Sequence, residues 1–445
     1  MFVENSIQNK IELLAPAKNF MALKASAPYA DAVYFGVENF NMRMKADNFS
    51  IQDLPRIAQI CHFPKDPTHR RRKAFLTLNI VIYENELNQL RKTIIAAKKA
   101  SIDAIIVHDL AVMQIAREVG IPFHISTQCN VSNSESAKFY ESLGAERIIL
   151  ARECSLKQIT QIIPKMTTAS IEVFIHGAMC SSISGRCYLS QTIACSADKS
   201  ANRGVCTQPC RGKWTLISES GHEFLYDGKR ILNSRDLCMI NYIPQLIEAG
   251  IKSFKIEGRM RHPHYVETVS RVYRKAIDAY YEGKFEEKRK KNKWITQLKQ
   301  VYNRGFTTGF YFGRASEKDS QLNSPANISH FRYIKMGEIV QSFPTNAVKI
   351  RLFNGTLKVG DEIIVMSTKK GGETYFTQKI KDIRIENKDV TKTAPATINS
   401  PVEITCKFDN ATSVEWQDAI FKFTDETYQK SLKKRYAKKP KYKLK

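Results

Sequence analysis

The chain has 445 residues, of which 43% are hydrophobic and 10% are aromatic, so most of it can fold around an apolar interior. This length exceeds one core of ordinary size, and we expect a large domain followed by a smaller one. The first ten residues lack the features of a signal peptide, and no apolar stretch approaches the roughly 20 residues that cross a bilayer. These features predict a cytoplasmic protein without a membrane segment.

The chain is strongly basic. It contains 69 Lys and Arg residues against 44 acidic ones, a formal net charge of +25. Such an excess favours a polyanionic partner, because basic side chains that neutralise phosphates release condensed counterions; a general gain in solubility is the other explanation. The excess is densest in residues 430–445, where nine of sixteen are Lys or Arg. We expect 425–445 to be a solvated basic tail.

Apolar β-type runs alternate with helical patterns, such as 86–100 and 134–145, through the first two thirds of the chain. This alternation predicts an α/β fold, and the number of runs favours a closed (β/α)8 barrel over residues 1–281. A doubly wound open sheet is the alternative, although no GxGxxG motif follows the first strand. The eight expected strands are 11–15, 32–36, 74–80, 104–108, 123–127, 147–150, 171–177 and 253–258.

Polar residues recur where these strands end, on the face that carries the active site in (β/α)8 barrels. Each one has a purely structural explanation as a helix cap or a hydrogen-bonding group. Their repetition at most strand ends favours a site. They are Asn79, His108, Asp109, Ser126, Thr127, Gln128, Arg152, His176, Glu257 and Arg259.

The composition and the pattern of expected elements change after the predicted barrel. Residues 282–330 begin with a charged, weakly apolar stretch and are expected to form a connector. Short alternating strands and turns fill 331–424, with hairpin signals at Asn354–Gly355 and Gly360–Asp361. We predict a small C-terminal antiparallel β-barrel. Such domains often accompany RNA-handling proteins, which is an analogy of fold alone.

Cysteine usage singles out one segment. Five of the ten cysteines fall within residues 180–210, and in a reducing compartment such crowding indicates metal binding. They are Cys180, Cys187, Cys195, Cys206 and Cys210. The segment 178–214 follows the seventh predicted strand, so we expect a cysteine-rich insertion at the barrel mouth. Its glycines permit tight turns and close backbone approach.

Four thiolates, Cys180, Cys187, Cys206 and Cys210, can hold either a [4Fe–4S] cluster or zinc. Structural zinc usually binds two short Cys-x2-4-Cys pairs, and only one such pair is present. The uneven spacing therefore favours the cluster, with zinc and metal-free thiols as alternatives. Four of the five cysteines outside the segment are expected to be packed thiols; they are Cys61, Cys129, Cys154 and Cys406.

The run Glu172–Cys180, followed by Gly185–Cys187, resembles the signature of the collagenase-like "U" peptidase family. Agreeing stretches are ELLAPAKN, DAVYFG, STQCNVSN, NRGVCTQPCR, LNSRDLC and KIEGRMRHPHYV. The motif VYNRGFTTGFYFG at 301–313 is typical of the branch that hydroxylates tRNA. The resemblance covers residues 11–313 well and the C-terminal β-domain more weakly.

This resemblance implies an Fe–S enzyme that converts the wobble uridine of tRNA to 5-hydroxyuridine and depends on prephenate. It assigns the cluster to Cys180, Cys187, Cys206 and Cys210, with Cys238 as a reserve ligand. A longer relative that acts on ribosomal RNA carries the same cysteines, so rRNA is an alternative substrate. The sequence shows no HExxH motif and no Ser–His–Asp or Cys–His pattern in a family-type context, which disfavours a peptidase. A non-catalytic RNA-binding factor is the third class.

Adding oxygen to a pyrimidine carbon requires a cofactor, because side chains perform such chemistry poorly. The target base must also leave its stack to enter a pocket. If prephenate binds there, arginines are its expected partners through paired hydrogen bonds. The candidate pocket residues are Arg43, His108, Gln128, His176, Arg186, Glu257 and Arg259.

Overall fold

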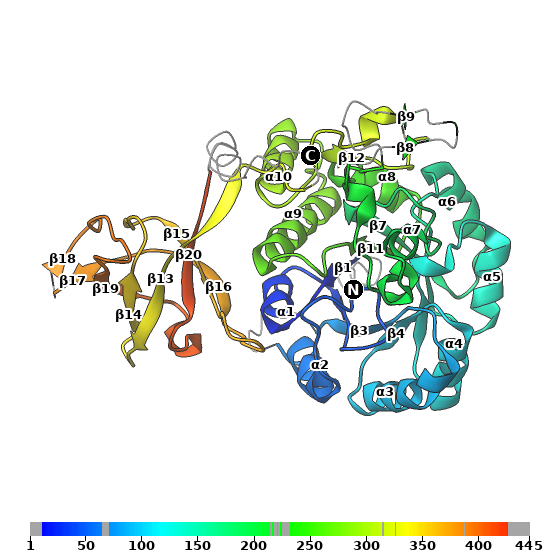
Figure 1. Ribbon diagram of the computed structural model, residues 1–445, viewed down its shortest axis with the longest axis horizontal. Helices are drawn as coiled ribbons and strands as arrows, with labels where there is room; N and C mark the ends of the chain where they lie inside the picture. The colour runs from blue at the N-terminus through cyan, green and yellow to red at the C-terminus, as the bar shows by residue number, and fades with distance from the viewer. Residues whose placement is uncertain are drawn as a thin grey trace, which may run out of the picture. The chain divides into compact units, whose positions relative to one another are not determined.

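The computed structural model describes residues 11–64, 71–213, 216–217, 220, 223–224, 232–313, 316–324, 326–386 and 388–425. The chain divides into two compact units, residues 1–328 and 329–445 (Figure 1). The predicted basic tail lies outside the described residues, apart from Asp425. Within the described ranges, no helix is both long and apolar enough to span a membrane.

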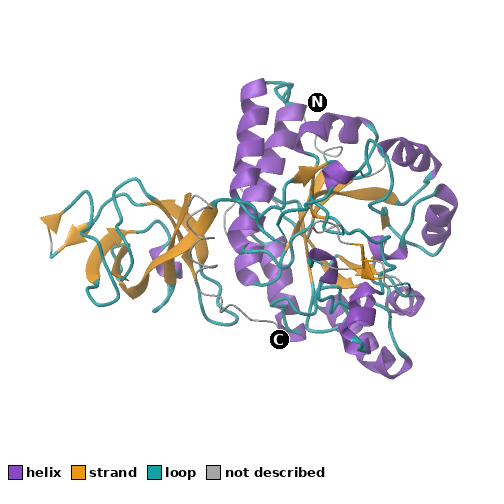
Figure 2. Cartoon of the chain, turned by 45° about the horizontal axis from the view of Figure 1, so that its top comes forward, coloured by secondary structure: helices purple, strands orange, loops and turns teal. Residues whose placement is uncertain are grey.

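Eight parallel strands form the centre of the first unit, surrounded by helices (Figure 2). Each strand pairs with the next, and the eighth pairs with both the seventh and the first, so the sheet closes on itself. The predicted (β/α)8 barrel is confirmed, and the open-sheet alternative is wrong. The strands are β1 (Glu12–Pro16), β2 (Ala32–Phe35), β3 (Lys73–Leu78), β4 (Ala104–Val107), β5 (Phe123–Ile125), β6 (Arg147–Ile149), β7 (Ser170–Ala178) and β11 (Ser253–Ile256).

The helices follow the strands, and several begin at a polar residue whose side chain caps the first turn. Asn19, Asn133 and Ser155 accept backbone N–H groups in this way. Asp109 also does so, accepting from Ala111 N at 2.9 Å, which assigns this strand-end residue a structural role. The α-helices outside the cysteine-rich loop are α1 (Phe20–Ser26), α2 (Leu54–His62), α3 (Leu87–Lys99), α4 (Leu110–Val119), α5 (Ser134–Ser142), α6 (Leu156–Ile162), α8 (Ile243–Glu248), α9 (Pro263–Tyr281) and α10 (Lys288–Gln300).

The range 282–330, expected to be a connector, is folded into the first unit up to residue 328. Helix α10 buries Trp294 and Leu298, which lie four residues apart on one helical face. Strand β12 (Phe306–Thr307) pairs with β10 (Asp236–Cys238), which itself pairs antiparallel with β7. The high charge of this range conceals a narrow apolar face, and this explains the difference from the expectation.

The second unit is an antiparallel sheet around its own apolar core, which confirms the predicted fold class. The sheet curls back: Gln378 on β16 donates to the carbonyl of Lys407 on β19 at 3.2 Å and accepts from Asp409 N at 3.1 Å. Its strands are β13 (Phe331–Ser342), β14 (Ala347–Leu352), β15 (Glu362–Met366), β16 (Tyr375–Lys379), β17 (Arg384–Ile385), β18 (Lys388–Asp389), β19 (Val402–Lys407) and β20 (Ala419–Asp425).

Candidate active site

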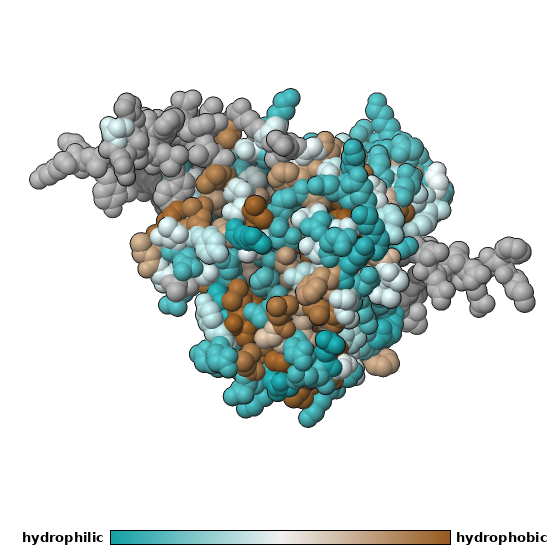
Figure 3. Space-filling view, turned by 90° about the vertical axis from the view of Figure 1, so that its right-hand side faces the viewer, coloured by the Kyte–Doolittle hydropathy of each residue, from teal (hydrophilic) through white to brown (hydrophobic). Residues whose placement is uncertain are grey.

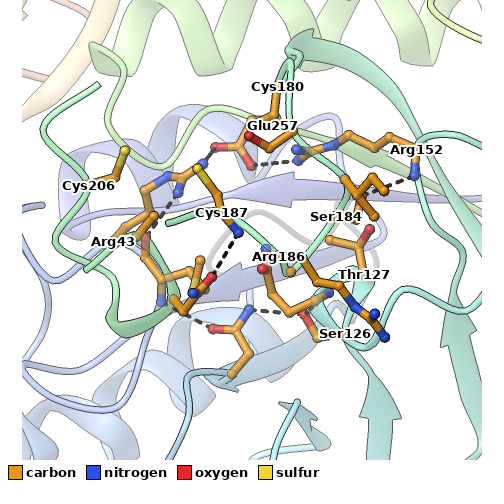
Figure 4. A pocket seen from close by; sticks show the side chains of 18 of the residues that line it. Arg43, Ser126, Thr127, Arg152, Cys180, Ser184, Arg186, Cys187, Cys206 and Glu257 are labelled. Atoms are coloured by element: carbon orange, nitrogen blue, oxygen red, sulfur yellow. Dashed lines mark hydrogen bonds and ion pairs between the residues drawn. The ribbon is translucent and has the colours of Figure 1, made fainter. Parts of the chain in front are cut away.

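A pocket opens at the carboxyl ends of the barrel strands (Figure 4). Its volume is about 150 Å³, well above the ~10–15 Å³ that one water molecule needs. It is lined partly by strand-end residues and partly by the cysteine-rich loop, as the sequence predicts for this face. Lining residues used below are Tyr34, Arg43, Thr77, Asn79, Gln128, Arg152, Phe174, Cys180, Ile183, Arg186, Cys187, Leu189, Cys206, Cys210, Lys255, Glu257 and Arg259.

The cysteine-rich loop is fastened internally and to its neighbours. The Ser190 hydroxyl accepts from Thr207 N at 2.9 Å and so connects α7 (Leu189–Ala194) to the end of the loop. Arg211 donates to the Met179 carbonyl at 2.8 Å, and Arg203 forms an ion pair with Glu86. These contacts hold the loop over the barrel mouth.

Two glycines let the loop approach neighbouring backbone closely. Gly185 has a φ of +75°, and a Cβ there would lie 1.9 Å from the carbonyl oxygen of Gln128. Gly204 has a φ of +81°, and a Cβ would lie 2.2 Å from the oxygen of Asn41. Any side chain would force the backbone to move, so these positions require glycine.

All four cysteines of the predicted ligand set line this one pocket. Burial raises the pKa of the Cys210 thiol, which also interacts electrostatically with the three other thiols. The four therefore lie near one another. Among the described residues, however, no group of three or more His, Cys, Asp or Glu side chains is already arranged to hold a metal ion.

The remaining cysteines lie outside the pocket lining. Cys195 is exposed at the end of α7. Cys238, the reserve ligand, is buried on β10, where the Tyr273 hydroxyl donates to its sulfur at 3.8 Å. Cys61, Cys154 and Cys406 are buried, as expected of packed thiols.

Glu257, just after β11, lies between two arginines (Figure 4). Its Oε1 is 3.1 Å from Arg43 Nη2, and its Oε2 is 3.5 Å from Arg152 Nη2. Burial by itself raises the pKa of the Glu257 carboxyl, but the two guanidinium groups outweigh this effect and hold that pKa below its usual value. Arg152 also stacks over the Phe174 ring at 4.1 Å. The carboxylate therefore fixes both arginines at the pocket wall.

Arg259 brings a buried positive charge to the same pocket. Its side chain donates to Thr77 Oγ1 and Asn41 Oδ1, each at 2.9 Å, and to Asn48 Oδ1. All three acceptors are neutral, and burial lowers the pKa of Arg259 to about 10. A Cβ at position 36 would lie 2.2 Å from Arg259 Nη2, so glycine at this position leaves room for the Arg259 guanidinium group.

Lys255 is a pocket residue that sequence reasoning missed. Its Nζ lies 3.0 Å from Glu172 Oε1 and 4.3 Å from the centre of the Tyr34 ring. Burial lowers its pKa, and the Glu172 carboxylate opposes that shift. A lysine in the middle of the apolar strand β11 is the signal that could have revealed it, since buried lysines are rare unless paired.

The two predicted histidines are not among the pocket-lining residues. His176 is 2% exposed and packs against the rings of Tyr265, Tyr273 and Phe306. Burial lowers its pKa to about 4, so it is neutral near pH 7. The structure thus places His176 within an aromatic cluster and not in the pocket lining.

His108 contacts a thiol that was not anticipated from the sequence. Its Nδ1 lies 3.6 Å from Cys129 Sγ. The Cys129 thiol donates to the His108 carbonyl at 3.4 Å. Burial raises the pKa of the Cys129 thiol to about 12. A nucleophilic cysteine needs a lowered pKa, so this pair lacks the main property of a cysteine peptidase.

Asn79 and Gln128 complete one side of the pocket with amide groups. Asn79 accepts from Met42 N at 3.2 Å and donates to the Ser126 hydroxyl at 3.2 Å, which fixes its orientation. The pocket therefore combines four thiols, an arginine-rich wall and amides that can hydrogen-bond to a planar polar ligand. These features define a (β/α)8-barrel protein with a pocket lined by cysteines and arginines at the carboxyl ends of its strands.

Comparison with known proteins agrees with this class. Residues 18–321 match Peptidase family U32, and the chain belongs to that family. The chain is 38% identical to a collagenase of Porphyromonas gingivalis over 411 residues, covering 89% of this chain and 95% of the relative. It is 36% identical to tRNA hydroxylation protein P1 of Bacillus subtilis, covering 84% and 88%. It is 34% identical to the 23S rRNA 5-hydroxycytidine C2501 synthase of Escherichia coli, covering 75% of this chain and 49% of that protein.

Proposed function

We propose that this protein hydroxylates a pyrimidine of structured RNA, converting the wobble uridine of tRNA to 5-hydroxyuridine with the aid of an iron–sulfur cluster. The observation that carries the proposal is the convergence of four cysteines and four arginines on one pocket at the carboxyl end of the barrel. Relatives named for tRNA and rRNA hydroxylation support the reaction class.

The cysteine set fits a [4Fe–4S] cluster in number and chemistry. Cys180, Cys187, Cys206 and Cys210 would hold it, and its binding would have to bring the four sulfurs together, since no ready metal-ligand group exists among the described residues. When bound, the cluster would supply the redox chemistry that C5 hydroxylation needs. Zinc on the same four thiolates would be a closed site with no open position for a reacting water, which disfavours a metallopeptidase.

The arginines suit a dicarboxylate such as prephenate. Arg259 carries a buried positive charge whose hydrogen-bond acceptors are neutral. The Glu257 carboxylate offsets part of the burial effect on the pKa of Arg259, and a ligand carboxylate in the pocket would add to this stabilisation. Arg43 and Arg152 already lie against one carboxylate, that of Glu257, and so present oriented donors. Charge-assisted hydrogen bonds of this kind are about twice as strong as neutral ones.

The size of the pocket and the charge of the chain support an RNA substrate. A pocket of this size admits a base only after it leaves its stack, which costs least in a single-stranded loop. Asn79 and Gln128 offer the amide groups that can read the polar edge of a pyrimidine. The net charge of +25 favours the polyanion.

The substrate is tested by deleting the gene and analysing three products of the same cells. We expect 5-hydroxyuridine-derived nucleosides to disappear from total tRNA, while ribosomal pyrimidines and collagen cleavage remain unchanged. If a hydroxylated ribosomal pyrimidine is lost while tRNA modification is unchanged, the substrate is rRNA rather than tRNA. Loss of collagen cleavage alone would favour the peptidase.

A further inference from the structure

Three nearby residues of the cysteine-rich loop have exposed side chains, and two of the three line the pocket. Ile183 and Arg186 line the pocket, yet Ile183 is 57% exposed and Arg186 is also exposed. Tyr188 is 68% exposed, although its chain neighbours Cys187 and Leu189 both line the pocket. A turn closed by the 3.0 Å bond from Arg186 N to the Ile183 carbonyl holds the first two together. We call these three residues the rim.

Exposure of an apolar side chain is not unusual by itself. Phe139 on α5 is 57% exposed, and Figure 3 shows apolar residues scattered among hydrophilic ones on the face that carries this helix. The rim differs in its place and in its charge. Residues 180–213 contain five Lys or Arg and one acidic residue, Asp198, so the segment that carries the rim is basic.

We propose that the rim holds the RNA nucleotide that flanks the reacting base, with the Tyr188 ring stacked on the flanking base and Arg186 paired with a phosphate. This inference rests on the proposed function and adds the RNA-binding surface of the same site. Single-stranded nucleic acid is recognised by aromatic rings that stack on bases beside cations that track the backbone. An exposed ring two residues from an exposed arginine, at the entrance of a base-sized pocket, provides both elements.

The test measures binding of the complete protein to an unmodified tRNA at several salt concentrations. Loss of one stacking ring costs about 1–3 kcal/mol, so Tyr188→Ala should raise Kd by about 5- to 150-fold. Tyr188→Phe keeps the ring and should retain the wild-type Kd. Tyr188→Leu keeps apolar volume without the π-face and should behave like the alanine variant. Arg186→Ala should reduce the slope of log K against log salt by about one phosphate contact.

The matched control is Phe63→Ala. Phe63 is 76% exposed and follows α2 at the opposite, amino-terminal end of the barrel strands, so its loss should leave Kd unchanged. Circular dichroism and iron content of each variant establish that the loop is intact. Turnover of Tyr188→Ala should show a raised KM with unchanged kcat, because Tyr188 is not among the residues that line the pocket.

The outcomes separate the rim from the proposed function. If the wild-type protein does not bind tRNA, both the proposed function and the proposed RNA-binding role of the rim are refuted. If the wild type binds and Tyr188→Ala binds equally well, only the rim is refuted. Tight binding by Tyr188→Leu would also overturn it, because apolar packing rather than base stacking would then explain the contact.

Discussion

Replacing Glu257 with glutamine tests whether this carboxylate holds the arginine wall of the pocket. The substitution keeps the size of the side chain and removes the charge that faces Arg43 and Arg152. Removing one partner of a buried ion pair costs about 3–5 kcal/mol, because the remaining charge is left without compensation. The side chains of Glu257 and Arg152 are 13% and 11% exposed, whereas that of Arg43 is 28% exposed and partly screened. We therefore expect a loss of about 3 kcal/mol.

The assay is thermal unfolding of the wild type and of Glu257→Gln. One kcal/mol shifts Tm by about 2–4 °C in domains of 150–250 residues, so a loss of about 3 kcal/mol should lower Tm by roughly 6–12 °C. The control is Glu118→Gln, which removes an exposed pair with Arg91 at 2.8 Å and should leave Tm unchanged.

The pH dependence gives the sign of the effect. Because the folded-state pKa of Glu257 is below its usual value of 4.5, its stabilisation is complete above that value and decreases as pH falls through the folded-state pKa. The Tm difference between wild type and Glu257→Gln should therefore be constant near neutrality and should shrink only in acid. Equal stability of the two proteins at pH 7 would refute the reasoning.

Three further outcomes follow from the site. Substituting Cys180 with serine should remove iron, sulfide and visible absorption from anaerobically purified protein, whereas Cys195→Ser should retain all three; iron retained in both would contradict the ligand assignment. Gly185→Ala should displace the loop and abolish iron loading, because the new Cβ would lie 1.9 Å from the Gln128 carbonyl oxygen. The control is Gly120→Ala: Gly120 has a φ of +72° and open space around it, so this substitution should cost only about 1 kcal/mol of stability. Equal behaviour of the two variants would exclude the close approach at Gly185 as the cause. Arg259→Met should weaken calorimetric binding of prephenate by about tenfold or more, and unchanged affinity would remove this arginine from the binding site.

The fold was largely predictable from the sequence. All eight barrel strands were expected within a few residues, because buried parallel strands read as continuous apolar runs. The segment 282–300 was harder to interpret, since only Trp294 and Leu298 mark the buried face of a highly charged helix. Periodicity over so few apolar residues is a weak signal.

The site was predictable in part. Strand-end position identified lining residues such as Asn79, Gln128, Arg152, Glu257 and Arg259, but the same rule also selected His108 and His176, which do not line the pocket. Position along a strand does not determine which side of the barrel wall a side chain faces when the strand ends irregularly. For His176 the register between β7 and β11 shifts at this point. The contact of His108 with Cys129 depends on packing between two strand ends, which no local pattern encodes.

The central claim is that this pocket modifies RNA by means of its cysteine set. It is tested most directly by returning the wild type, Cys180→Ala or Cys195→Ala to a strain that lacks the protein and any second enzyme of the same activity. The measurement is mass spectrometry of nucleosides from total tRNA. Wild type and Cys195→Ala should restore 5-hydroxyuridine-derived nucleosides, and Cys180→Ala should not. Full restoration by Cys180→Ala, or normal modification in the deletion strain itself, would contradict the account.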